Sequence, residues 1–487
     1  MALGIGYGLP FVAQHGTTPY KTQWSAAYQG AKGAGASVED ENAGTGSCLV
    51  ARGQDVYTDG LPSTPSLLIV PQFYKAGNLY QDVPPFVAED TTMRFAVSRN
   101  TTATRVNSSG LIESVASGVP RIDWLGQSCP ALLVEPSAQN LAFHSESWVS
   151  GNNWTLTDVT NVTGATSAPN GNATANALSP TAASASHFVF SNGTTTVSYT
   201  SGTIYTQSAF FKAGTGAAGQ FVQLTFPSAR FTQLGYANFD LIAGTVSVVS
   251  GASADANRAA RIESYGDGWY RCIFTATCNS TGTGAGLIIS LITSTGSGRL
   301  PSFTGVTGNV LYGWGAQLET GSIATTYIPT TTAAVSRAAD VISASGALVS
   351  GLIGQTEGTM YFQIRDLKGL ATGTGNPALA IRNTAFTNWI GLTSNSVLTP
   401  FRITVRSTTT TLINYTSAIT EGKVAIAYSA NGAIVYVNGS EVASTATNPN
   451  LTLNIVTMEQ YMPFKVESLA LYTTRLSNDQ LAELTRL

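Results

Sequence analysis

Alternation of hydrophobic and polar positions is the main pattern in the chain, and it is clearest between residues 148 and 335. Turn-forming residues separate the alternating segments, and no segment shows a helical period. Short strands at this spacing are typical of a β-sandwich or jelly roll. The segments are His187–Phe190, Ile204–Phe211, Phe221–Phe226, Trp269–Phe274, Gly286–Ile292 and Val310–Leu318.

A second set of alternating segments fills residues 348–487. Asn438-Gly439 lies between two of them and predicts a hairpin with a type I′ turn, which needs positive φ at both positions. The end of the chain differs, because Ser477 and Gln480 form a capping-box pattern before Leu481 and Leu484, so a short helix is expected there. The predicted strands are Thr359–Ile364, Phe401–Val405, Lys423–Tyr428 and Ile434–Val437.

The first 90 residues have no clear period and mix glycine with aromatic residues, among them Tyr7, Phe11, Tyr20 and Trp24. Such a segment cannot easily build its own core, so we expect it to dock on a partner. Within it, the apolar run Leu67–Val70 lies between two prolines and is either a buried strand or an extended arm.

The predicted fold class is therefore all-β, with tandem jelly-roll or β-sandwich domains, an irregular N-terminal region and one short C-terminal helix. The expected division has an irregular region at 1–90, a β-rich connecting segment at 91–147 and a jelly-roll module at 148–335. A linker follows at 336–347, and a second sandwich occupies 348–487.

Composition excludes several classes of function. The 487 residues carry 24 Lys and Arg against 27 Asp and Glu, a net charge of -3, and charged residues make up 10%, against about 25% in an average globular protein. A nucleic-acid binder needs a basic surface that this balance does not supply. We find no apolar run of about 18 residues that would span a membrane. The N-terminus also lacks the basic segment of a secretory signal.

Searches for catalytic and metal-binding patterns lead us to expect no enzyme, no metal and no cofactor. The four cysteines include no Cys-x-x-Cys pair and the three histidines are scattered, which makes a zinc site improbable. Cys272 and Cys278 lie on one predicted strand, too far apart for a disulfide, and are expected to be free and buried. No Gly-x-Ser-x-Gly motif occurs, and no strand carries alternating acids, although isolated acids could still meet in space.

Aromatic residues are the remaining lead to a binding site, since sugar-binding sandwiches stack Trp or Tyr on sugar rings. Core packing is the favoured role for each of the five available aromatics, Trp154, Trp269, Trp314, Trp389 and Tyr461. Trp389 lies beside a polar turn and is the candidate for carbohydrate contact.

A series of motifs runs through residues 95–340, about half of the chain. The motifs are Phe95–Glu113, Val119–Asp123, Leu132–Leu141, Ser145–Trp148, Gly266–Arg271, Trp314–Ser322, Thr326–Thr330 and Ser336–Asp340. In sequence and in order they resemble head-spike and tail-fibre proteins of tailed bacteriophages.

Residues 348–487 resemble a concanavalin A-like, or laminin-G-like, lectin domain. The similarity rests on Lys423–Tyr428, Val435–Gly439 and Leu469–Ser477, the last leading into the terminal helix. The calcium ligands that some members of this family carry cannot be placed in this sequence.

The two resemblances together imply a non-enzymatic virion structural protein, a fibre or spike that presents lectin-like modules to host glycans. The protein would be made in the cytoplasm of the infected bacterium and lie on the virion surface. They also imply docking on capsid, portal, collar or tail proteins through the N-terminal aromatics, and a homo-oligomer, preferably a trimer. Nucleic-acid binding and membrane insertion are not expected. A capsid decoration or collar protein without a receptor and a capsule depolymerase remain as alternatives.

Overall fold

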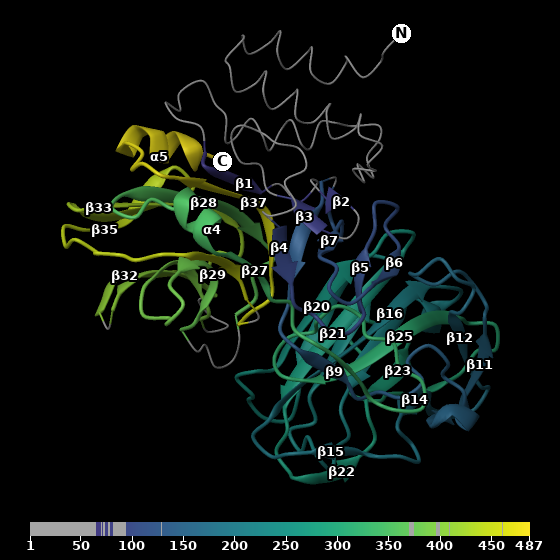
Figure 1. The fold of residues 1–487 in the computed structure, drawn as a ribbon. Coiled ribbons are helices and arrows are strands. Elements are labelled where there is room, and N and C mark those ends of the chain that lie inside the picture. The colour runs from purple at the N-terminus through teal and green to yellow at the C-terminus, as the bar shows by residue number, and fades with distance from the viewer. Residues whose placement is uncertain are drawn as a thin grey trace, which may run out of the picture. The chain divides into compact units, whose positions relative to one another are not determined.

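The computed structural model describes residues 65–69, 71, 74–75, 78–80, 94–127, 129–369, 375–395, 400–408, 410–459 and 461–487. Within them the chain is almost all β, which confirms the fold class expected from the alternating pattern. The chain forms two compact units (Figure 1). We call residues 103–114 with 137–337 the middle unit, and the rest of the described chain the C-terminal unit.

The middle unit is a sandwich of two six-stranded antiparallel sheets. One sheet has the order β10 (Trp154–Thr157), β14 (Phe188–Ser191), β23 (Ile288–Ile292), β17 (Phe221–Thr225), β18 (Tyr236–Asp240) and β19 (Thr245–Ser250). The other has the order β11 (Val159–Thr163), β12 (Asn176–Pro180), β25 (Leu311–Thr320), β16 (Ile204–Ala213), β21 (Trp269–Thr277) and β20 (Ala259–Ser264). The six strands expected from alternation between residues 187 and 318 are thereby confirmed.

Four two-stranded pairs and two short 3-10 helices complete the middle unit. The pairs are β13 (Ser184–Ser186) with β24 (Ser302–Thr304), β15 (Val197–Tyr199) with β22 (Gly282–Gly284), β26 (Val335–Arg337) with β9 (Ala138–Asn140), and β5 (Ala103–Val106) with β6 (Ile112–Val115). The helices are η1 (Ser150–Asn152) and η2 (Ala217–Gly219).

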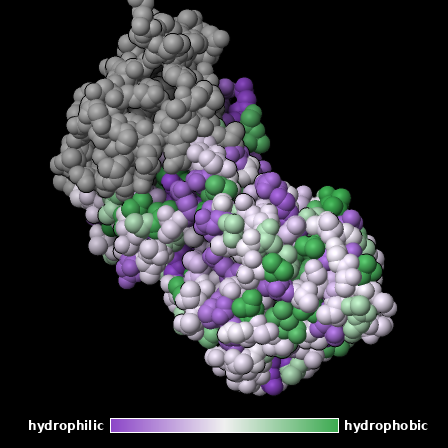
Figure 2. All heavy atoms as spheres, turned by 90° about the vertical axis from the view of Figure 1, so that its right-hand side faces the viewer, coloured by the Kyte–Doolittle hydropathy of each residue, from purple (hydrophilic) through white to green (hydrophobic). Residues whose placement is uncertain are grey.

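Alternating residues of both middle-unit sheets meet in one apolar core. Tyr205, Ala209 and Phe211 of β16 belong to it, as do Leu224 of β17 and Ile289 of β23. Alternate side chains of a strand point to opposite faces of its sheet, so the inner faces of the two sheets pack against each other. On the face shown in Figure 2, hydrophobic residues are interspersed with hydrophilic ones.

The C-terminal unit is a larger sandwich of a nine-stranded and an eight-stranded antiparallel sheet. The nine-stranded sheet has the order β2 (Tyr74–Lys75), β3 (Asn78–Tyr80), β4 (Arg94–Val97), β27 (Ile342–Ser345), β36 (Ile455–Met458), β29 (Pro377–Arg382), β30 (Trp389–Thr393), β31 (Phe401–Ser407) and β32 (Thr410–Ser417). The eight-stranded sheet has the order β35 (Ser440–Thr445), β34 (Gly432–Val437), β33 (Gly422–Ser429), β28 (Gly358–Arg365), β37 (Phe464–Tyr472), β8 (Ala131–Val134) and β7 (Arg121–Asp123), with β1 (Leu67–Ile69) also paired to β37. Figure 1 shows β28 and β37 in one layer of this unit and β29 and β32 in the other.

The apolar run at Leu67 is a buried strand rather than an extended arm. Leu67 pairs with Leu471 and Ile69 with Leu469 in antiparallel register, and both side chains join the core of the C-terminal unit. The remaining core residues come from alternating positions of both sheets, such as Ile381 and Ile390.

The local signals read from the sequence of the C-terminal unit are confirmed. Asn438 and Gly439 both have positive φ, at 50° and 84°, as a type I′ turn requires. Helix α5 (Asn478–Leu484) begins with a complete capping box between Ser477 and Gln480 and buries Leu481. A second short helix, α4 (Ala347–Leu352), was not expected from the sequence.

The two cysteines expected to be free, Cys272 and Cys278, are both free and buried. Burial raises the pKa of the Cys272 thiol well above its usual range. Cys129 is disulfide-bonded.

Among the described residues, no helix is both long and apolar enough to cross a membrane.

Candidate functional site

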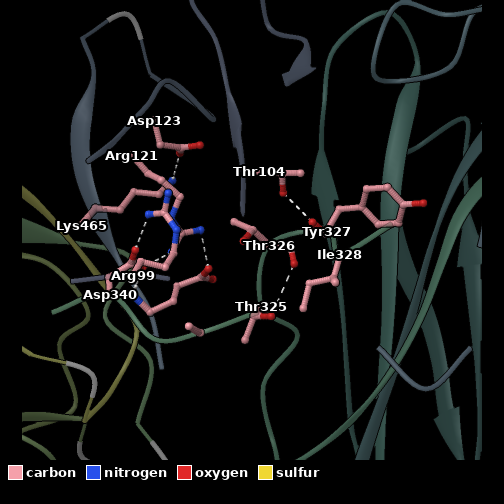
Figure 3. A network of polar contacts seen from close by, with 12 residues as sticks. Arg99, Thr104, Arg121, Asp123, Thr325, Thr326, Tyr327, Ile328, Asp340 and Lys465 are labelled. Atoms are coloured by element: carbon pink, nitrogen blue, oxygen red, sulfur yellow. Dashed lines mark hydrogen bonds and ion pairs between the residues drawn. The ribbon is translucent and has the colours of Figure 1, made fainter. Parts of the chain in front are cut away.

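The motifs that carry the resemblance to phage proteins form buried polar networks. In the C-terminal unit, Asp340 accepts a hydrogen bond from Arg99 at 2.8 Å and another from Arg121. Arg121 also donates to Glu135 at 2.8 Å. All four side chains are buried, and Figure 3 shows the two guanidinium groups converging on Asp340. These residues hold together segments that are far apart in sequence, so their role is structural.

The corresponding motifs of the middle unit hold the segment after β25 against its own sheet. Glu319 accepts hydrogen bonds from the backbone N–H and the hydroxyl of Thr325, the latter at 2.6 Å. Gln317 accepts from the N–H of Ile328 at 2.7 Å. Figure 3 shows Thr104 donating to the carbonyl of Tyr327. Burial raises the pKa of Glu319 above its ordinary value, with Arg271 and its hydrogen bonds acting in the opposite direction.

The tryptophans of the middle unit also serve its structure. Trp154, Trp269 and Trp314 are at most 2% exposed, as the sequence predicts for core residues. Trp314 packs against Phe210 and Tyr327 with ring centroids 5.4 and 4.5 Å apart. A binding role therefore has to be sought elsewhere.

A row of three large polar and aromatic residues crosses the outer face of the nine-stranded sheet. Arg382 of β29 pairs directly with Trp389 of β30, which in turn pairs with Arg406 of β31. Their strand neighbours Ile381, Ile390 and Val405 belong to the core. Because side chains alternate along a strand, the row must face away from the core. We call Arg382, Trp389 and Arg406, together with Phe386, the outer-face site.

Trp389 is the aromatic residue that the sequence singles out for carbohydrate contact. It is 7% exposed, and the guanidinium carbon of Arg406 lies 4.7 Å from the centre of its ring. The indole N–H is buried and has no hydrogen-bond partner among the described residues. A buried donor without an acceptor is costly and calls for an explanation, such as a ligand oxygen that completes it. The predicted contact of Trp389 with a sugar stays a prediction.

Phe386 is the exposed aromatic residue of the site, with 39% of its surface accessible. It lies in the turn between β29 and β30 and has a φ of 55°. A bulky side chain in this left-handed region is an outlier that costs about 1 kcal/mol or more. The strain suggests a reason other than stability for an aromatic residue here.

The turn that carries Phe386 is held by two asparagines. The side-chain oxygen of Asn383 accepts the N–H groups of Thr387 and Asn388 at 2.9 and 3.1 Å. Asn388 accepts the N–H of Thr408, at the end of the next hairpin, at 2.6 Å. These bonds fix the position of Phe386 relative to Trp389 and Arg406.

Arg382 is held firmly and its charge is neutralised. Its Nε and Nη2 donate to one oxygen of Glu459 at 3.1 and 2.8 Å, and Thr457 donates to the same oxygen at 2.8 Å. The guanidinium carbon lies 3.7 Å from the ring centre of Phe386, a close cation–π contact. Burial, followed by the charge of Glu459, raises the pKa of the neighbouring Tyr461.

The outer-face site has an excess of positive charge. Between Asp366 and Glu421 the sequence contains no acidic residue, and the strands β29 to β32 all lie within this stretch. Arg402 lies on the same face of β31 as Arg406, and its Nε donates to the neutral Asn414 at 2.7 Å. Glu459 offsets Arg382 alone, so Arg402 and Arg406 leave a local charge of +2 in a chain of net charge -3.

The sequence pattern points to Trp389 as a candidate and does not point to Phe386 or the arginines. The missing signal was the stretch without acidic residues, which contains Arg382, Arg402 and Arg406 in strands of alternating pattern. The predicted docking residues Tyr7, Phe11, Tyr20 and Trp24 lie outside the described residues.

No group of three or more His, Cys, Asp or Glu in the described part of the chain is placed to hold a metal ion.

Comparisons with solved structures find partial likenesses to other proteins. The binding domain of botulinum neurotoxin DC, solved in complex with rat synaptotagmin II, is 13% identical, with a TM-score of 0.24 over 30% of this chain and 39% of that one. NanB sialidase from Streptococcus pneumoniae is 15% identical, with a TM-score of 0.21 over 29% of this chain and 26% of that one. A leech intramolecular trans-sialidase is 17% identical, with the same TM-score and coverage. Likenesses this partial say nothing about function.

No protein-family model matches the sequence, and the search of curated proteins gives no match.

Proposed function

We propose that this protein is a bacteriophage virion structural protein, a head or tail fibre or spike, that attaches to host-surface glycans without covalent chemistry. The outer-face site carries the proposal. Sugar rings offer apolar faces to aromatic side chains and hydroxyl groups to charged and amide groups, and sites for small ligands combine these features. Phe386, Trp389 and Arg406 supply such a combination on a lectin-like sandwich.

The strain at Phe386 supports a binding role. An aromatic residue in a left-handed backbone conformation is unfavourable for stability. Glycine or asparagine would adopt the same conformation at lower cost. Contact with a ligand accounts for an aromatic ring at this position.

The virion role rests on the resemblance of residues 95–340 to phage spike and fibre proteins. In such a protein Tyr7, Phe11, Tyr20 and Trp24 would dock on capsid, portal, collar or tail proteins. A homotrimer would present several outer-face sites together. Linked weak sites gain apparent affinity by multivalency, so one sandwich could bind its glycan weakly.

The proposal includes no catalytic step, and the carboxylates support this. A glycoside hydrolase needs two carboxyl groups facing a cleft. In the described residues, the buried carboxylates are engaged by structural partners: Asp340 and Glu135 by arginines, Glu459 by Arg382, and Glu319 by Thr325.

A capsid decoration or collar protein without a receptor is the second candidate. The low exposure of Trp389 favours it, because Arg406 covers one face of the indole ring. A sugar could then stack on Phe386 but not on that face of Trp389.

Labelling of intact virions distinguishes the two candidates. Gold-tagged antibody against residues 348–487 should decorate the tail tip or fibres that project from the head or collar. Virions carrying Phe386→Ala should adsorb more slowly to host cells than wild-type virions, with equal amounts of the protein per particle. Gold spread evenly over the capsid shell, together with unchanged adsorption, would favour decoration and refute attachment.

A further inference from the structure

We propose, building on the proposed glycan-binding function, that the glycan is acidic and that Arg406 binds one of its carboxylates at the outer-face site. The same argument assigns Arg402 to a second acidic group of the glycan. The inference rests on unsatisfied donors, on an unpaired cation and on the spacing of the two arginines.

Arg406 lacks the carboxylate partner that four other arginines of the C-terminal unit have among the described residues. Arg99, Arg121, Arg365 and Arg382 each form an ion pair with Asp or Glu. Among the described residues, Arg406 contacts the ring of Trp389 and forms no ion pair, and its Nε is buried without an acceptor. A half-buried guanidinium without a counter-charge is an unfavourable arrangement that an anion would relieve.

Two unsatisfied donors lie on residues that pair directly across two strands. They are the indole N–H of Trp389 and the Nε–H of Arg406. Both can only donate, and neither side chain contains an acceptor. An ionised carboxylate is an acceptor without a donor, and it matches the guanidinium geometry with paired hydrogen bonds. A hydroxyl of a neutral sugar matches this pair less well, because it carries no charge.

Arg402 extends the site along β31. It is four residues from Arg406 on the same face, so their Cα atoms are about 13 Å apart at the usual rise of a strand. Its Nε is held by Asn414, and its other N–H groups have no partner among the described residues. Two fixed cations at this spacing suit a saccharide with repeated acidic groups better than a single charged sugar.

Other anionic partners fit the outer-face site less well than an acidic saccharide. Nucleic acids and anionic membranes are bound by extended basic surfaces. At this site only Arg406 and the neighbouring Arg402 are cations without an ion pair among the described residues, in a chain of net charge -3. The aromatic ring of Phe386, exposed beside the paired Arg382, adds an apolar surface suited to a sugar ring.

The test is binding of the purified full chain to an array that carries sialylated and uronic-acid saccharides beside their carboxyl-reduced neutral forms. Duplex DNA and vesicles containing phosphatidylserine are included as other anions. The variants are Arg406→Gln, Arg406→Lys and Arg402→Gln. The charge-matched control is Arg486→Gln, which removes a cation that is largely exposed and already paired with Glu483. Thermal unfolding of each variant establishes that it folds.

We expect binding to the acidic saccharides and not to their neutral forms, weakening as salt is added. Arg406→Gln should lower the affinity by about tenfold to a hundredfold, the usual effect of losing a hydrogen bond to a charged group. Arg402→Gln should lower it less, Arg406→Lys should restore part of it, and Arg486→Gln should leave it unchanged.

Three results would overturn the inference. Equal binding to acidic and neutral saccharides, unaffected by Arg406→Gln, would remove the acidic glycan but keep the proposed function. Binding to DNA or vesicles instead of saccharides, lost in Arg406→Gln, would assign the arginines to another anion. Binding to none of these probes would remove both the inference and the glycan-binding function.

Discussion

The guanidinium group of Arg406 lies over the ring of Trp389, 4.7 Å from its centre, although the two residues are 17 positions apart in sequence. Their pairing across β30 and β31 brings them together. The contact holds the guanidinium group in place before a ligand binds. Less side-chain conformational entropy is therefore lost on ligand binding. The same contact covers one face of the indole, whose N–H is also buried, so Phe386 is the aromatic surface exposed to a sugar.

Trp389→Phe should separate binding from stability. The phenyl ring keeps most of the packing and the cation–π contact. The substitution also removes a buried N–H that has no acceptor in the described part of the chain. The free energy of unfolding should therefore change by less than about 1.5 kcal/mol, while saccharide binding falls. Urea unfolding and array binding measure the two effects. Unchanged binding would show that the indole N–H meets no ligand.

Phe386→Gly should remove an aromatic contact without destabilising the protein. Glycine adopts a φ of 55° without strain, which should add about 1 kcal/mol to the free energy of unfolding. Loss of the contact between the ring and Arg382 offsets part of this gain. We expect the free energy of unfolding to stay equal or rise slightly, and host-cell adsorption to fall. A clear loss of stability would mean that Phe386 is retained for packing, and would weaken the case for the site.

The pair of Arg382 and Glu459 should respond strongly to removal of either partner. Glu459→Gln or Arg382→Met leaves one buried charge without its counterpart, at a cost of about 3–5 kcal/mol. The double variant should lose much less than the sum, because no unpaired charge remains. A double-mutant cycle in urea measures the coupling. Additive losses would show that the two charges do not stabilise each other.

The alternating pattern predicted much of the fold because one face of each strand is buried. Strands such as β16 and β33 lie within a few residues of the segments read from the sequence. Likewise, the Asn438-Gly439 turn and the Ser477 capping box follow from local chemistry that needs no tertiary information.

The polar networks and most of the outer-face site could not be predicted in this way. Asp340 and Arg99 form an ion pair although they are 241 positions apart in sequence, and Arg382 and Glu459 are 77 positions apart. Their pairing therefore depends on the order of the strands in the sheets. Trp389 was visible because a polar turn precedes it. Arg406 became meaningful only when register placed it beside Trp389.

Asp340→Asn should be among the most damaging single substitutions in the C-terminal unit. The change leaves the buried Arg99 without its ion-pair partner among the described residues and removes a carboxylate that contacts Arg121. Loss of one member of such a buried network costs about 3–5 kcal/mol. Urea unfolding followed by tryptophan fluorescence should show the loss, with Asp479→Asn on the exposed start of α5 as the control. Equal midpoints for the two variants would contradict a structural role for the network.

Glu319 should make the stability of the middle unit depend on pH. Burial raises the pKa of this carboxyl in the folded state, so the folded chain holds the proton more tightly than the unfolded chain. Glu319 therefore contributes least to the free energy of unfolding at pH values above its folded-state pKa. The contribution becomes more favourable as the pH falls through the folded-state pKa toward the pKa in the unfolded chain, about 4.3. Glu319→Gln removes this titration and keeps an oxygen that can accept from Thr325. The difference in unfolding free energy between wild type and variant should move in favour of the wild type as the pH is lowered from about 7 to about 5, a range that extends above the ordinary pKa of Glu. Urea unfolding across that range provides the measurement, and a difference that does not change with pH would show that Glu319 titrates alike in both states.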